Sequence, residues 1–495
     1  MKTYHSTRNL HIQASFHEAV LQGIASDGGL FVKDDIQKDK IDLDTLLHAS
    51  YQEMAIAVLS KFLDDFSNEQ IEQCVYNAYN TNFDTTEITP LVKVGKHHVL
   101  ELFHGPTCAF KDIALQILPQ FMQTALQMEP NHKDIVILTA TSGDTGKAAL
   151  EGFKDVDKIK IIVFYPYQLV SEMQERQMIT TTGKNTAVIS LHGNFDDCQR
   201  IVKQAFANNE LVNELNNMNY QFSSANSINI GRLCPQITYY FYSYMQLVKN
   251  NEIQLHDKVN FVVPTGNFGN ILAGYYAKLL GLPIHKLICA SNSNHILTDF
   301  ISTGIYDRNR NLEKTISPSM DILISSNLER LLYELHPNTE DVAKWMKQLN
   351  ENGRYEIPQE LLDKIQDIFH CGYANDDECK QTINYNYKAN NYVMDTHTSC
   401  AAKVLEDYLK DTNDTHKSII LSTASCYKFS KDVLSALDDQ PYPSEWEYMN
   451  QLQKVSKQPI SENLSKLKEM PILHHNQTTK EDAFDTILSI IKEKF

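Results

Sequence analysis

Short apolar runs alternate with amphipathic segments between residues 96 and 291, and this is the most regular pattern along the chain. The apolar runs are 135–140 (IVILTA), 159–166 (IKIIVFYP), 186–193 (TAVISLHG), 258–264 (KVNFVVP) and 285–291 (HKLICAS). Each of the first four is followed by a segment with the apolar spacing of a helix. Buried strands that alternate with helices are typical of parallel βαβ units, so the pattern predicts a doubly wound α/β core with parallel sheets.

Residues 1–95 carry a different pattern, which predicts a separate N-terminal domain. After a turn at 26–29 and the short apolar run LFV, apolar residues recur at helical spacing over roughly 42–63 and 67–80. Ser67 is suited to cap the second of these helices. Because the segment carries no evident chemistry, we interpret it as a scaffold that braces the core.

The remaining segments complete the core and add to its periphery. Residues 417–429 (KSIILSTASCYKF) predict a last buried strand with a hydroxyl-rich end, and 339–391 have the charged pattern of surface helices. We therefore place a core of two lobes at 96–440, in which 339–391 form a peripheral helical insertion. A helical extension follows at 441–495.

Composition narrows the class of protein. The 495 residues are 42% hydrophobic and 22% charged, which is typical of a globular protein, and the net charge is −17. This acidity argues against nucleic acid or an anionic membrane as the main partner, although a local basic site stays compatible with it. No apolar run approaches the roughly 20 residues of a membrane span, and the first residues lack the apolar core of a signal peptide. The nine scattered cysteines form no CxxC pair, so we expect reduced thiols in a cytoplasmic protein rather than disulfides or a zinc site.

Lys111 lies next to the end of the stretch ELFHGPTCAFKD (101–112), around which we expect the chemistry to be organised. The triplet 105–107 (GPT) reads as a turn, and the apolar pattern after Lys111 reads as a helix. An amine held out of water at such a junction loses its proton and attacks a carbonyl, as the Schiff-base lysines of pyridoxal phosphate enzymes do. A surface lysine packed along the helix is the alternative, and for a lysine taken alone it is the more common case.

Two glycine-bearing loops follow apolar runs at positions where parallel sheets bind ligands. The loop 266–270 (GNFGN) would let backbone N–H groups surround a phosphate at a helix start, although a plain tight turn fits as well. The loop 142–146 (SGDTG) offers hydroxyl and N–H donors suited to a carboxylate or a phosphate. Lys147 after it is not the lysine of a nucleotide-binding P-loop, because Thr141 replaces the required glycine and Ala148 the required Ser or Thr.

Other polar residues admit a chemical and a structural interpretation. Within 422–425 (STAS), a hydroxyl would hydrogen-bond a ring nitrogen without protonating it, but a simple Ser/Thr turn is equally compatible. His104 and His397 have no partner at metal-ligand spacing, so we predict loop or core histidines and no metal. Cys108 has no adjacent base, so we predict a small buried packing residue rather than a nucleophile.

The motifs together resemble the threonine synthase family. The matching segments are YHSTRN (4–9), SDGGLFV (26–32), HGPTCAFKD (104–112), TATSGDTG (139–146), SANSINIGR (224–232), PTGNFGNILAG (264–274), SPSMDI (317–322) and LSTASCYKF (421–429). They occur in the family's order and span nearly the whole chain. The resemblance implies the tryptophan-synthase-β-like fold of pyridoxal phosphate enzymes (fold type II) with an extra N-terminal domain.

The resemblance also implies the reaction and its residues. The family converts O-phospho-L-homoserine and water into L-threonine and phosphate, with pyridoxal 5′-phosphate as cofactor. It implies that Lys111 bonds to the cofactor aldehyde and that Thr423 faces the pyridine nitrogen. Asp144 would lie near the phenolic oxygen of the cofactor or near the substrate carboxylate. The cofactor phosphate would be held by Gly266, Asn267, Phe268, Gly269 and Asn270.

Residues expected to contact the substrate are Ser142, Thr145, Asn226 and Arg232, with Arg232 the candidate for its phosphate. The sequence departs from the family's usual residues at Ile230-Gly231, Lys147 and Cys426, which leaves details of the substrate site open. We expect a small-molecule substrate, no nucleic acid or membrane partner, and a monomer or homodimer.

Two further functions stay open. The first is another pyridoxal phosphate lyase of this fold, such as a threonine or serine dehydratase or a phospholyase that adds no water. The second is a non-catalytic sensor of a phosphorylated metabolite, which the presence of Lys111 argues against.

Overall fold

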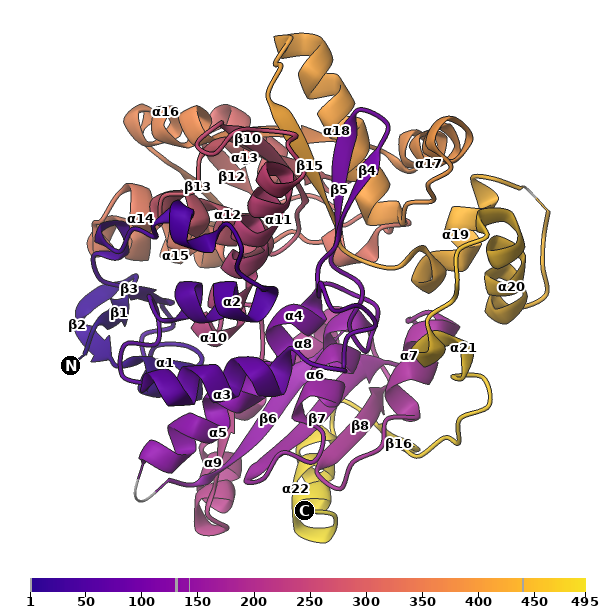
Figure 1. Cartoon of the computed structure of the whole chain (residues 1–495). Helices are drawn as coiled ribbons and strands as arrows, with labels where there is room; N and C mark the ends of the chain where they lie inside the picture. Colours follow the sequence, from indigo (N-terminus) through magenta and orange to yellow (C-terminus); the bar gives the residue numbers. More distant parts are fainter. Residues whose placement is uncertain (1, 130–131, 142, 439) are drawn as a thin grey trace.

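Two parallel β-sheets form the core of the molecule, a computed structural model that describes all residues except 1, 130–131, 142 and 439 (Figure 1). In strand order, the six-stranded sheet contains β14 (Phe369–Tyr373), β11 (Ile284–Ser291), β10 (Val259–Pro264), β15 (Lys417–Ser422), β5 (His97–Glu101) and β4 (Leu91–Val94). The five-stranded sheet contains β16 (Asn476–Thr478), β8 (Thr186–Leu191), β7 (Ile159–Pro166), β6 (Asp134–Ala140) and β9 (Tyr220–Ser223). Every neighbouring pair is parallel except β4–β5. The predicted α/β core with parallel sheets is therefore confirmed.

The central strands, such as β6 and β10, are mostly apolar because both faces of each sheet are covered. In β10, Phe261 and Val263 contribute to one apolar cluster, whereas Val262 between them contributes to another on the opposite face. In β6, Ile137 and Leu138 divide between two clusters in the same way. This alternation follows from successive side chains pointing to opposite faces of a strand.

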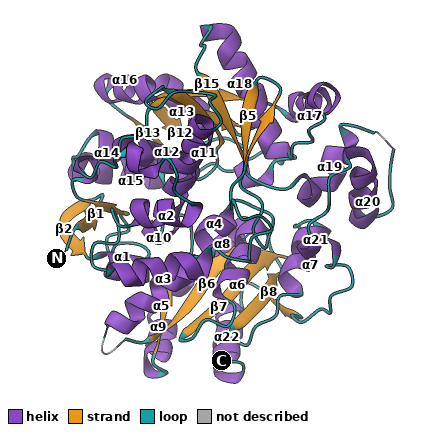
Figure 2. Ribbon diagram, in the orientation of Figure 1, coloured by secondary structure: helices purple, strands orange, loops and turns teal. Residues whose placement is uncertain are grey.

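Helices cover the four faces (Figure 2). On the six-stranded sheet, one face packs against α17 (Asp376–Asn390) and α18 (Thr396–Thr412), and the other against α11 (Ile237–Lys249), α12 (Gly269–Leu279), α13 (Ile296–Thr303) and α16 (Gln359–Ile368). On the five-stranded sheet, one face packs against α8 (Phe195–Ala207), α9 (Asn209–Asn217) and α22 (Ala483–Glu493), and the other against α4 (Lys111–Leu115), α5 (Leu118–Met128) and α6 (Asp144–Phe153). The short helices α7 (Glu172–Ile179) and α10 (Ile230–Leu233) lie between these elements and the loops of the site.

The N-terminal segment forms a small antiparallel sheet and three helices. Its elements are β2 (Asn9–Ala14), β1 (Tyr4–Ser6), β3 (Phe31–Lys33), α1 (Phe16–Gln22), α2 (Tyr51–Leu59) and α3 (Asn68–Ala78). The helix expected over 42–63 is in fact a 3₁₀ turn (Leu43–Leu46) followed by α2. The predicted cap of the next helix is confirmed, since the Ser67 hydroxyl accepts the Gln70 N–H at 3.2 Å.

A buried ion pair joins this domain to helix α14 (Leu328–Leu335) of the core. The guanidinium of Arg8 donates to both carboxylate oxygens of Glu329, at 2.8 and 2.7 Å, and the Thr7 hydroxyl donates to the same carboxylate at 2.6 Å. Arg330, fully buried beside them, donates from Nε to the carbonyl of Phe31 in β3 at 3.0 Å. A bidentate pair of this kind fixes orientation as well as position.

Several strands lie where the sequence predicted none. The predicted N-terminal boundary at 95 falls in the turn between β4 and β5, which pair with each other, so it would divide one sheet. The insertion expected to be a peripheral set of helices also supplies the edge strand β14. The extension expected to be helical contributes β16 to the five-stranded sheet, besides α20 (Glu445–Ser456), α21 (Glu462–Ser465) and α22. Polar residues in these short strands hid them from the apolar pattern.

Further short elements complete the chain. They are α15 (Thr339–Asn352), α19 (Ser430–Ser435) and the hairpin of β12 (Ile305–Asp307) with β13 (Arg354–Glu356). Among the described residues, no helix combines the length and apolarity that a membrane span requires. All nine cysteines are unpaired.

Gly152 provides a test of how closely the helices under the site are packed. A Cβ atom at this position of α6 would lie 1.9 Å from the carbonyl oxygen of Leu115 at the end of α4. We therefore expect Gly152→Ala to lower the free energy of unfolding by about 1–3 kcal/mol, as overpacking does, although the same change in an open helix stabilises. Chemical denaturation measures this difference. Lys203→Ala, at an exposed position of α8, is the control, and a Gly152→Ala protein as stable as the wild type would contradict the packing.

Candidate active site

The candidate residues gather beyond the carboxyl ends of strands from both sheets. Thr423 follows β15 and the loop 266–270 follows β10 in one lobe, while Asp144 follows β6 in the other. Lys111, in the chain segment that follows β5, begins α4, as the sequence predicted for a loop-to-helix junction. Carboxyl ends of parallel strands are the usual position for ligands in such sheets.

A short antiparallel bridge brings Lys111 and Thr423 together. Ala109 pairs with Ala424, the Phe110 N–H donates to the Thr423 carbonyl at 2.8 Å, and the Ser425 N–H donates to the Cys108 carbonyl at 3.0 Å. The segment before the lysine is therefore held by the end of a central strand. A loop lysine is given a fixed position in this way.

A buried carboxylate shapes the turn before the lysine. Asp112 accepts the Thr107 N–H at 2.8 Å and the Thr107 hydroxyl at 2.7 Å. Burial raises the pKa of Asp112 to about 6, against the opposing effect of these two hydrogen bonds. Gly105 has to be glycine here, because a Cβ would lie 2.5 Å from the Asp112 Cβ.

The surroundings of Lys111 favour a neutral amine. The protein around its half-buried side chain displaces water, and this lowers the pKa of Lys111 to about 8, although the carboxylate of Asp144 acts in the opposite direction. The nearby charges of Lys428 and Arg232 lower this pKa further. A lysine with a pKa near 8 supplies far more free amine at neutral pH than an ordinary one.

Asp144 is held as an anion at the first turn of α6. Its Oδ1 lies 2.8 Å from the Lys428 ammonium and accepts the Gln174 amide N–H at 3.2 Å. Burial alone would raise the pKa of Asp144, but the charges of Lys428 and Lys111 hold it well below its usual range. Lys428 also donates to the Thr107 carbonyl at 2.9 Å, so it connects Asp144 to the lysine segment.

No role was predicted from the sequence for Lys428 or Gln174. Lys428 is 2% exposed, and Gln174 lies in the first turn of α7. Lys428 lies in the stretch LSTASCYKF, and its only sequence signal was a lysine shortly after a buried strand.

The glycine-bearing loop has the features of an anion cradle. Helix α12 begins at Gly269, directly after Phe268, whose φ of 64° is left-handed. The Asn270 Oδ1 accepts hydrogen bonds from the hydroxyls of Tyr239 and Tyr240 at 2.5 and 3.1 Å, whereas its buried Nδ2 has no partner among the described residues. A free amide donor beside a helix N-terminus is suited to a phosphate.

The backbone of this loop is held from the opposite side. The Ser325 hydroxyl donates to the Gly266 carbonyl at 2.7 Å. The backbone N–H and the side-chain amide of Asn327 each donate to the Asn267 carbonyl at 3.1 Å. A Cβ at Gly266 would lie 2.6 Å from the Ser319 carbonyl oxygen. The carbonyls are thus occupied, which leaves the amide groups of the loop for an anion.

Arg232 is a buried cation near Lys111. Its Nη1 donates to the Ala225 carbonyl at 2.8 Å, its Nε has no partner, and it makes no ion pair with any residue that the structure describes. Burial lowers the pKa of Arg232 to about 10, so it stays charged at neutral pH. Such a guanidinium is suited to an incoming anion.

The other predicted substrate contacts lie around Arg232 and Asp144. Asn226 accepts the Thr139 hydroxyl at 2.9 Å, which leaves its amide N–H groups for other partners. Thr145 lies beside Asp144 in the first turn of α6. Ser142 lies outside the described residues.

The residues predicted to be structural have structural partners. His104 bridges Asp84 and Glu101 at 2.6 and 2.9 Å, and these hydrogen bonds outweigh burial and raise its pKa to about 9. Cys108 is buried and burial raises its pKa to about 12, which excludes a thiolate nucleophile at neutral pH. The Lys147 ammonium is bound by Glu151 and Thr181 at 2.7 and 3.1 Å.

His397 supports the phosphate loop indirectly. Its Nδ1 faces the Asp395 carboxylate at 3.0 Å, so its Nε2 is free to accept the Ser319 N–H at 3.2 Å. The Ser319 carbonyl in turn packs against Gly266. The predicted core histidine is confirmed, and its connection to the loop could not be predicted from spacing in sequence.

The arrangement fits pyridoxal 5′-phosphate. A free amine for its aldehyde, a helix-start cradle with an unused amide donor for its phosphate and a neutral hydroxyl at Thr423 are the three groups that it needs. Two family models match the chain: "Threonine synthase N terminus" over residues 3–79 and "Pyridoxal-phosphate dependent enzyme" over residues 84–357.

Characterised proteins with similar sequences carry related names. Threonine synthase of Saccharomyces cerevisiae is 37% identical, over 88% of this chain and 89% of its own length. Threonine synthase of Pseudomonas aeruginosa is 36% identical, over 88% and 90%. Threonine synthase-like 1 of Homo sapiens is 39% identical over 85% of this chain, which spans 58% of that protein.

Two solved structures superpose on this chain over its full length. Threonine synthase from Brucella melitensis, crystallised with bound pyridoxal phosphate, superposes with a TM-score of 0.87 at 34% identity, and covers 100% of this chain and 99% of its own. The yeast enzyme gives a TM-score of 0.88 at 34% identity, with coverages of 100% and 98%.

The low pKa of Lys111 predicts selective labelling of cofactor-free protein. Only the neutral amine reacts with formaldehyde, so reductive methylation of Lys111 should reach half its maximal rate near pH 8. An exposed lysine such as Lys203 should require a pH near its ordinary pKa of about 10.4. Peptide mapping across a pH series measures both profiles.

Lys428 supplies the matched variants. Lys428→Met should move the Lys111 profile to higher pH, because a positive charge that lowers this pKa is lost, while Lys428→Arg should leave the profile close to the wild type. A Lys111 profile that coincides with that of Lys203 would contradict the electrostatics of the site.

Proposed function

The chain belongs to the threonine synthase family of pyridoxal-phosphate-dependent lyases, and we propose that it converts O-phospho-L-homoserine and water into L-threonine and phosphate with Lys111 as its central catalytic residue. One observation carries this proposal. A lysine whose pKa lies near 8 is held by the end of β15, with two cations and two carboxylates around it.

Each part of the cofactor has a candidate partner. Lys111 would bond to its aldehyde carbon, the amide groups of Gly266, Asn267, Phe268, Gly269 and Asn270 would hold its phosphate, and the Thr423 hydroxyl would face its ring nitrogen. When bound, pyridoxal phosphate stabilises negative charge on carbon atoms of an attached amino acid.

Lys111 acts as the acid and base of the reaction. Its Nζ, when free, would take protons from the α- and β-carbons of the substrate and would return protons at the γ-carbon, which becomes the methyl group, and at the α-carbon. A pKa near 8 suits both directions of proton transfer at neutral pH. The reaction releases phosphate from the γ-carbon and adds water at the β-carbon.

Asp144 acts as a positioning residue. The family resemblance places Asp144 near either the phenolic oxygen of the cofactor or the substrate carboxylate, and both of these groups are acceptors or anions. An ionised carboxylate that already accepts from Lys428 and Gln174 repels such groups. We therefore infer that Asp144 orients Lys428 and stabilises the protonated form of Lys111.

Arg232 binds the substrate phosphate in this proposal. It is the buried cation near Lys111 without an ion-pair partner among the described residues. Asn226 and Thr145, with Ser142 from the matching motif, supply hydrogen bonds to the rest of the substrate.

A neutral Thr423 hydroxyl at the ring nitrogen limits how much negative charge the ring accepts. The charge therefore stays available at the substrate carbons, which favours loss of the γ-phosphate over transamination. Two neighbouring interactions hold Thr423, since its carbonyl accepts the Phe110 N–H and Ala424 after it pairs with Ala109.

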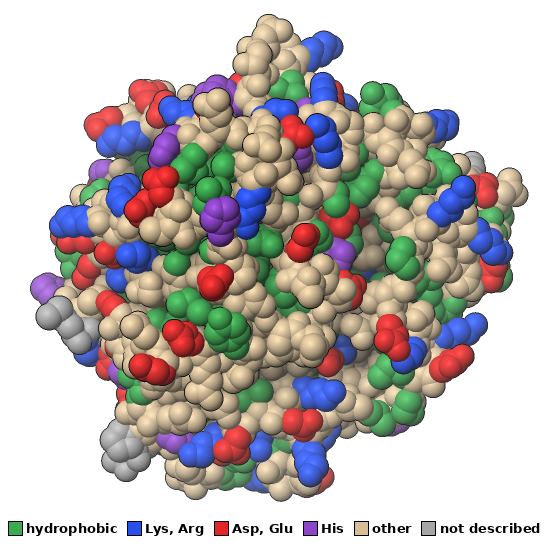
Figure 3. Space-filling model, in the orientation of Figure 1, with side chains coloured by type: hydrophobic (Ala, Val, Ile, Leu, Met, Phe, Trp, Pro, Cys, Tyr) green, Lys and Arg blue, Asp and Glu red, His purple; other side chains and the backbone are tan. Residues whose placement is uncertain are grey.

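We further propose a cytoplasmic enzyme, a monomer or homodimer, that acts on a small molecule and not on nucleic acid. Nine unpaired thiols suit a reducing compartment. Acidic and basic side chains are interspersed on the face drawn in Figure 3. We place the limit between the N-terminal domain and the two-lobed core before β4, and treat 441–495 as an extension that packs on both lobes.

A second candidate function is a phospholyase that releases phosphate without making threonine. It is favoured by the 39% identity to threonine synthase-like 1 of Homo sapiens, whose name distinguishes it from the synthases. The products separate the two functions: threonine and phosphate in one case, and a keto acid, ammonia and phosphate in the other.

Lys111→Arg tests the central residue. The wild-type protein with pyridoxal phosphate should show a visible absorption band that borohydride removes, with the reduced adduct on the peptide that contains Lys111. Lys111→Arg should lose this adduct and at least about 10³-fold of threonine formation, since an arginine stays protonated. Threonine formation by Lys111→Arg at the wild-type rate would refute the proposal, and ammonia in place of threonine from the wild type would favour the phospholyase.

Arg232→Gln tests the phosphate contact. Loss of a charge-assisted bidentate contact should raise KM for O-phospho-L-homoserine by about 10- to 100-fold, with cofactor absorbance unchanged. Arg200→Gln, which removes an exposed guanidinium that pairs with Asp197 in α8, is the control and should leave KM unchanged. Equal KM values for wild type and Arg232→Gln would exclude Arg232 from the phosphate site.

A further inference from the structure

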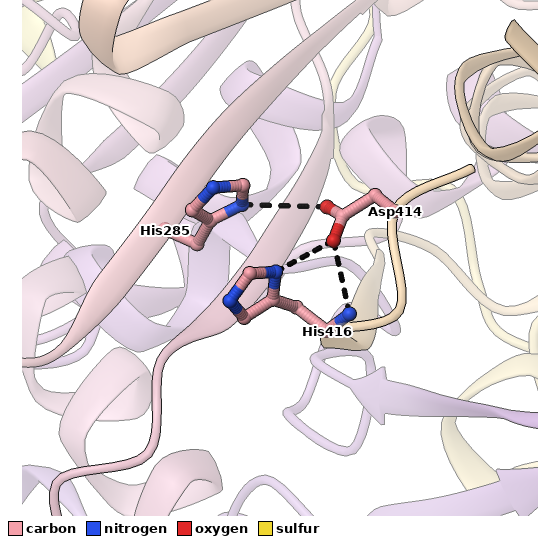
Figure 4. Close-up of side chains that lie close together, drawn as sticks. All are labelled: His285, Asp414 and His416. Carbon is pink, nitrogen blue, oxygen red and sulfur yellow. Dashed lines mark hydrogen bonds and ion pairs between the residues drawn. The ribbon is translucent and has the colours of Figure 1, made fainter. Parts of the chain in front are cut away.

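Two histidines and an aspartate lie together at the amino ends of strands β11 and β15, at the end of the six-stranded sheet opposite the active site (Figure 4). His285 lies near the start of β11, and Asp414 and His416 lie in the loop that leads into β15. The active-site loops leave the carboxyl ends of the sheet's strands, whereas this cluster lies at their amino ends. The proposed catalytic reaction assigns it no role.

The carboxylate of Asp414 is saturated by donors. The Tyr408 hydroxyl donates to Oδ2 at 2.6 Å and the Asn260 amide at 2.7 Å, while the backbone N–H of His416 donates to Oδ1 at 3.0 Å. The His416 Nδ1 lies 2.5 Å from Oδ1. Asp414 is therefore a fixed acceptor that sets the orientation of its neighbours.

These contacts determine which ring nitrogen carries the proton. The His416 Nδ1 faces only the Asp414 carboxylate, and the His285 Nδ1 lies 3.1 Å from the Asn260 Oδ1 and 3.3 Å from the Asp414 Oδ2. All of these partners are acceptors, so each Nδ1 must be the N–H donor. Each Nε2 consequently presents a lone pair.

The two lone pairs are close to each other and accessible. The rings of His285 and His416 are stacked, with centroids 3.9 Å apart and planes 18° apart, and Figure 4 shows both Nε2 atoms on the side away from Asp414. Neither Nε2 has a hydrogen-bond partner among the residues that the structure describes. The side chains are 30% and 36% exposed, so an ion from solution can reach them.

We propose that His285 and His416 bind a divalent transition-metal ion, such as Ni²⁺, Cu²⁺ or Zn²⁺, through their Nε2 atoms. Imidazole nitrogen suits these ions, and metal-bound histidines usually donate their other N–H to a carboxylate or carbonyl oxygen, as both do here. One candidate ligand atom of each of His285, Asp414 and His416 lies within 4.8 Å of the others. The two rings are nearly parallel, so their Nε2 lone pairs point along nearly parallel lines. Binding of one ion therefore requires the rings to rotate apart until both Nε2 atoms face it, and water completes its coordination.

The ammonium of the neighbouring Lys286 is bound by the backbone carbonyls of Gln366 and Asp367. Its charge still acts on His285, since it adds to burial in lowering the pKa of that imidazole. An ion at this position would connect the start of β11 to the start of β15. Because those strands carry the active-site loops at their other ends, we expect an effect on stability rather than on the chemistry of turnover.

Titration of the cofactor-loaded enzyme with NiCl₂, followed by calorimetry, tests the proposal. We expect one site with a dissociation constant in the micromolar range and a higher melting temperature at saturating Ni²⁺. His285→Gln and His416→Gln should each weaken this site by at least tenfold and abolish the rise in melting temperature. His11→Gln, an exposed histidine of β2 outside the cluster, should leave both unchanged.

A second readout identifies the ligands even if a variant is less stable. With Cu²⁺, the electron paramagnetic resonance spectrum of the wild type should show two imidazole nitrogens, and each single variant should show one or none. No Ni²⁺ binding up to 1 mM, or a site whose affinity is the same in both variants as in the wild type, overturns the proposal. Because neither histidine belongs to the catalytic site, threonine formation by both variants in metal-free buffer should equal that of the wild type.

Discussion

The hydrogen-bonded bridge between residues 108–110 and 423–425 is the constraint on which the active site depends. It makes the segment before Lys111 a continuation of the sheet, although that segment contains no regular strand of its own. The same bridge fixes Thr423, so the amine and the hydroxyl are positioned by a single contact. Asp112 and Lys428 then secure the turn on either side of Thr107. These hydrogen bonds to the backbone of residues 107–110 therefore hold the segment that carries the lysine in place.

Helix α14 extends this rigidity to the phosphate loop and to the N-terminal domain. Asn327 holds the Asn267 carbonyl and accepts from Arg330 at 2.6 Å, and Arg330 also donates to the carbonyls of Phe31 and Ile228. The loop 266–270 and the loop that leads into α10, the helix of Arg232, thus share one buried guanidinium with the N-terminal domain. The scaffold role expected for residues 1–95 has a concrete form here, since the Phe31 carbonyl helps to orient the residues around the site.

The sequence predicted those parts of the fold that local physics determines. Buried strands such as β6 and β10 are apolar on both faces, and Lys111 follows a glycine–proline turn, so both were recognisable. The short strands β14 and β16 were missed because they contain polar residues and exist only by pairing with an apolar neighbour. The contact of Asp144 with Lys428 was missed because it joins distant segments through the fold. The local sequence pattern thus predicts helices, strands and loops, whereas the tertiary structure is needed to show which strands pair and which side chains contact each other.

The charges around Lys111 explain why the site is suited to an anionic substrate. Arg232 is buried without a counter-ion among the described residues, and burial disfavours its charged form, as its lowered pKa shows. The carboxylates of Asp144 and Asp112 face Lys428 and Lys111, so these two carboxylates are shared among three cations when Arg232 is included. The protein therefore keeps an uncompensated positive charge in its interior, which lowers the stability of the folded state. In the function proposed here, a phosphorylated substrate bound at Arg232 would compensate this charge, and part of its affinity would come from the uncompensated charge of the free protein.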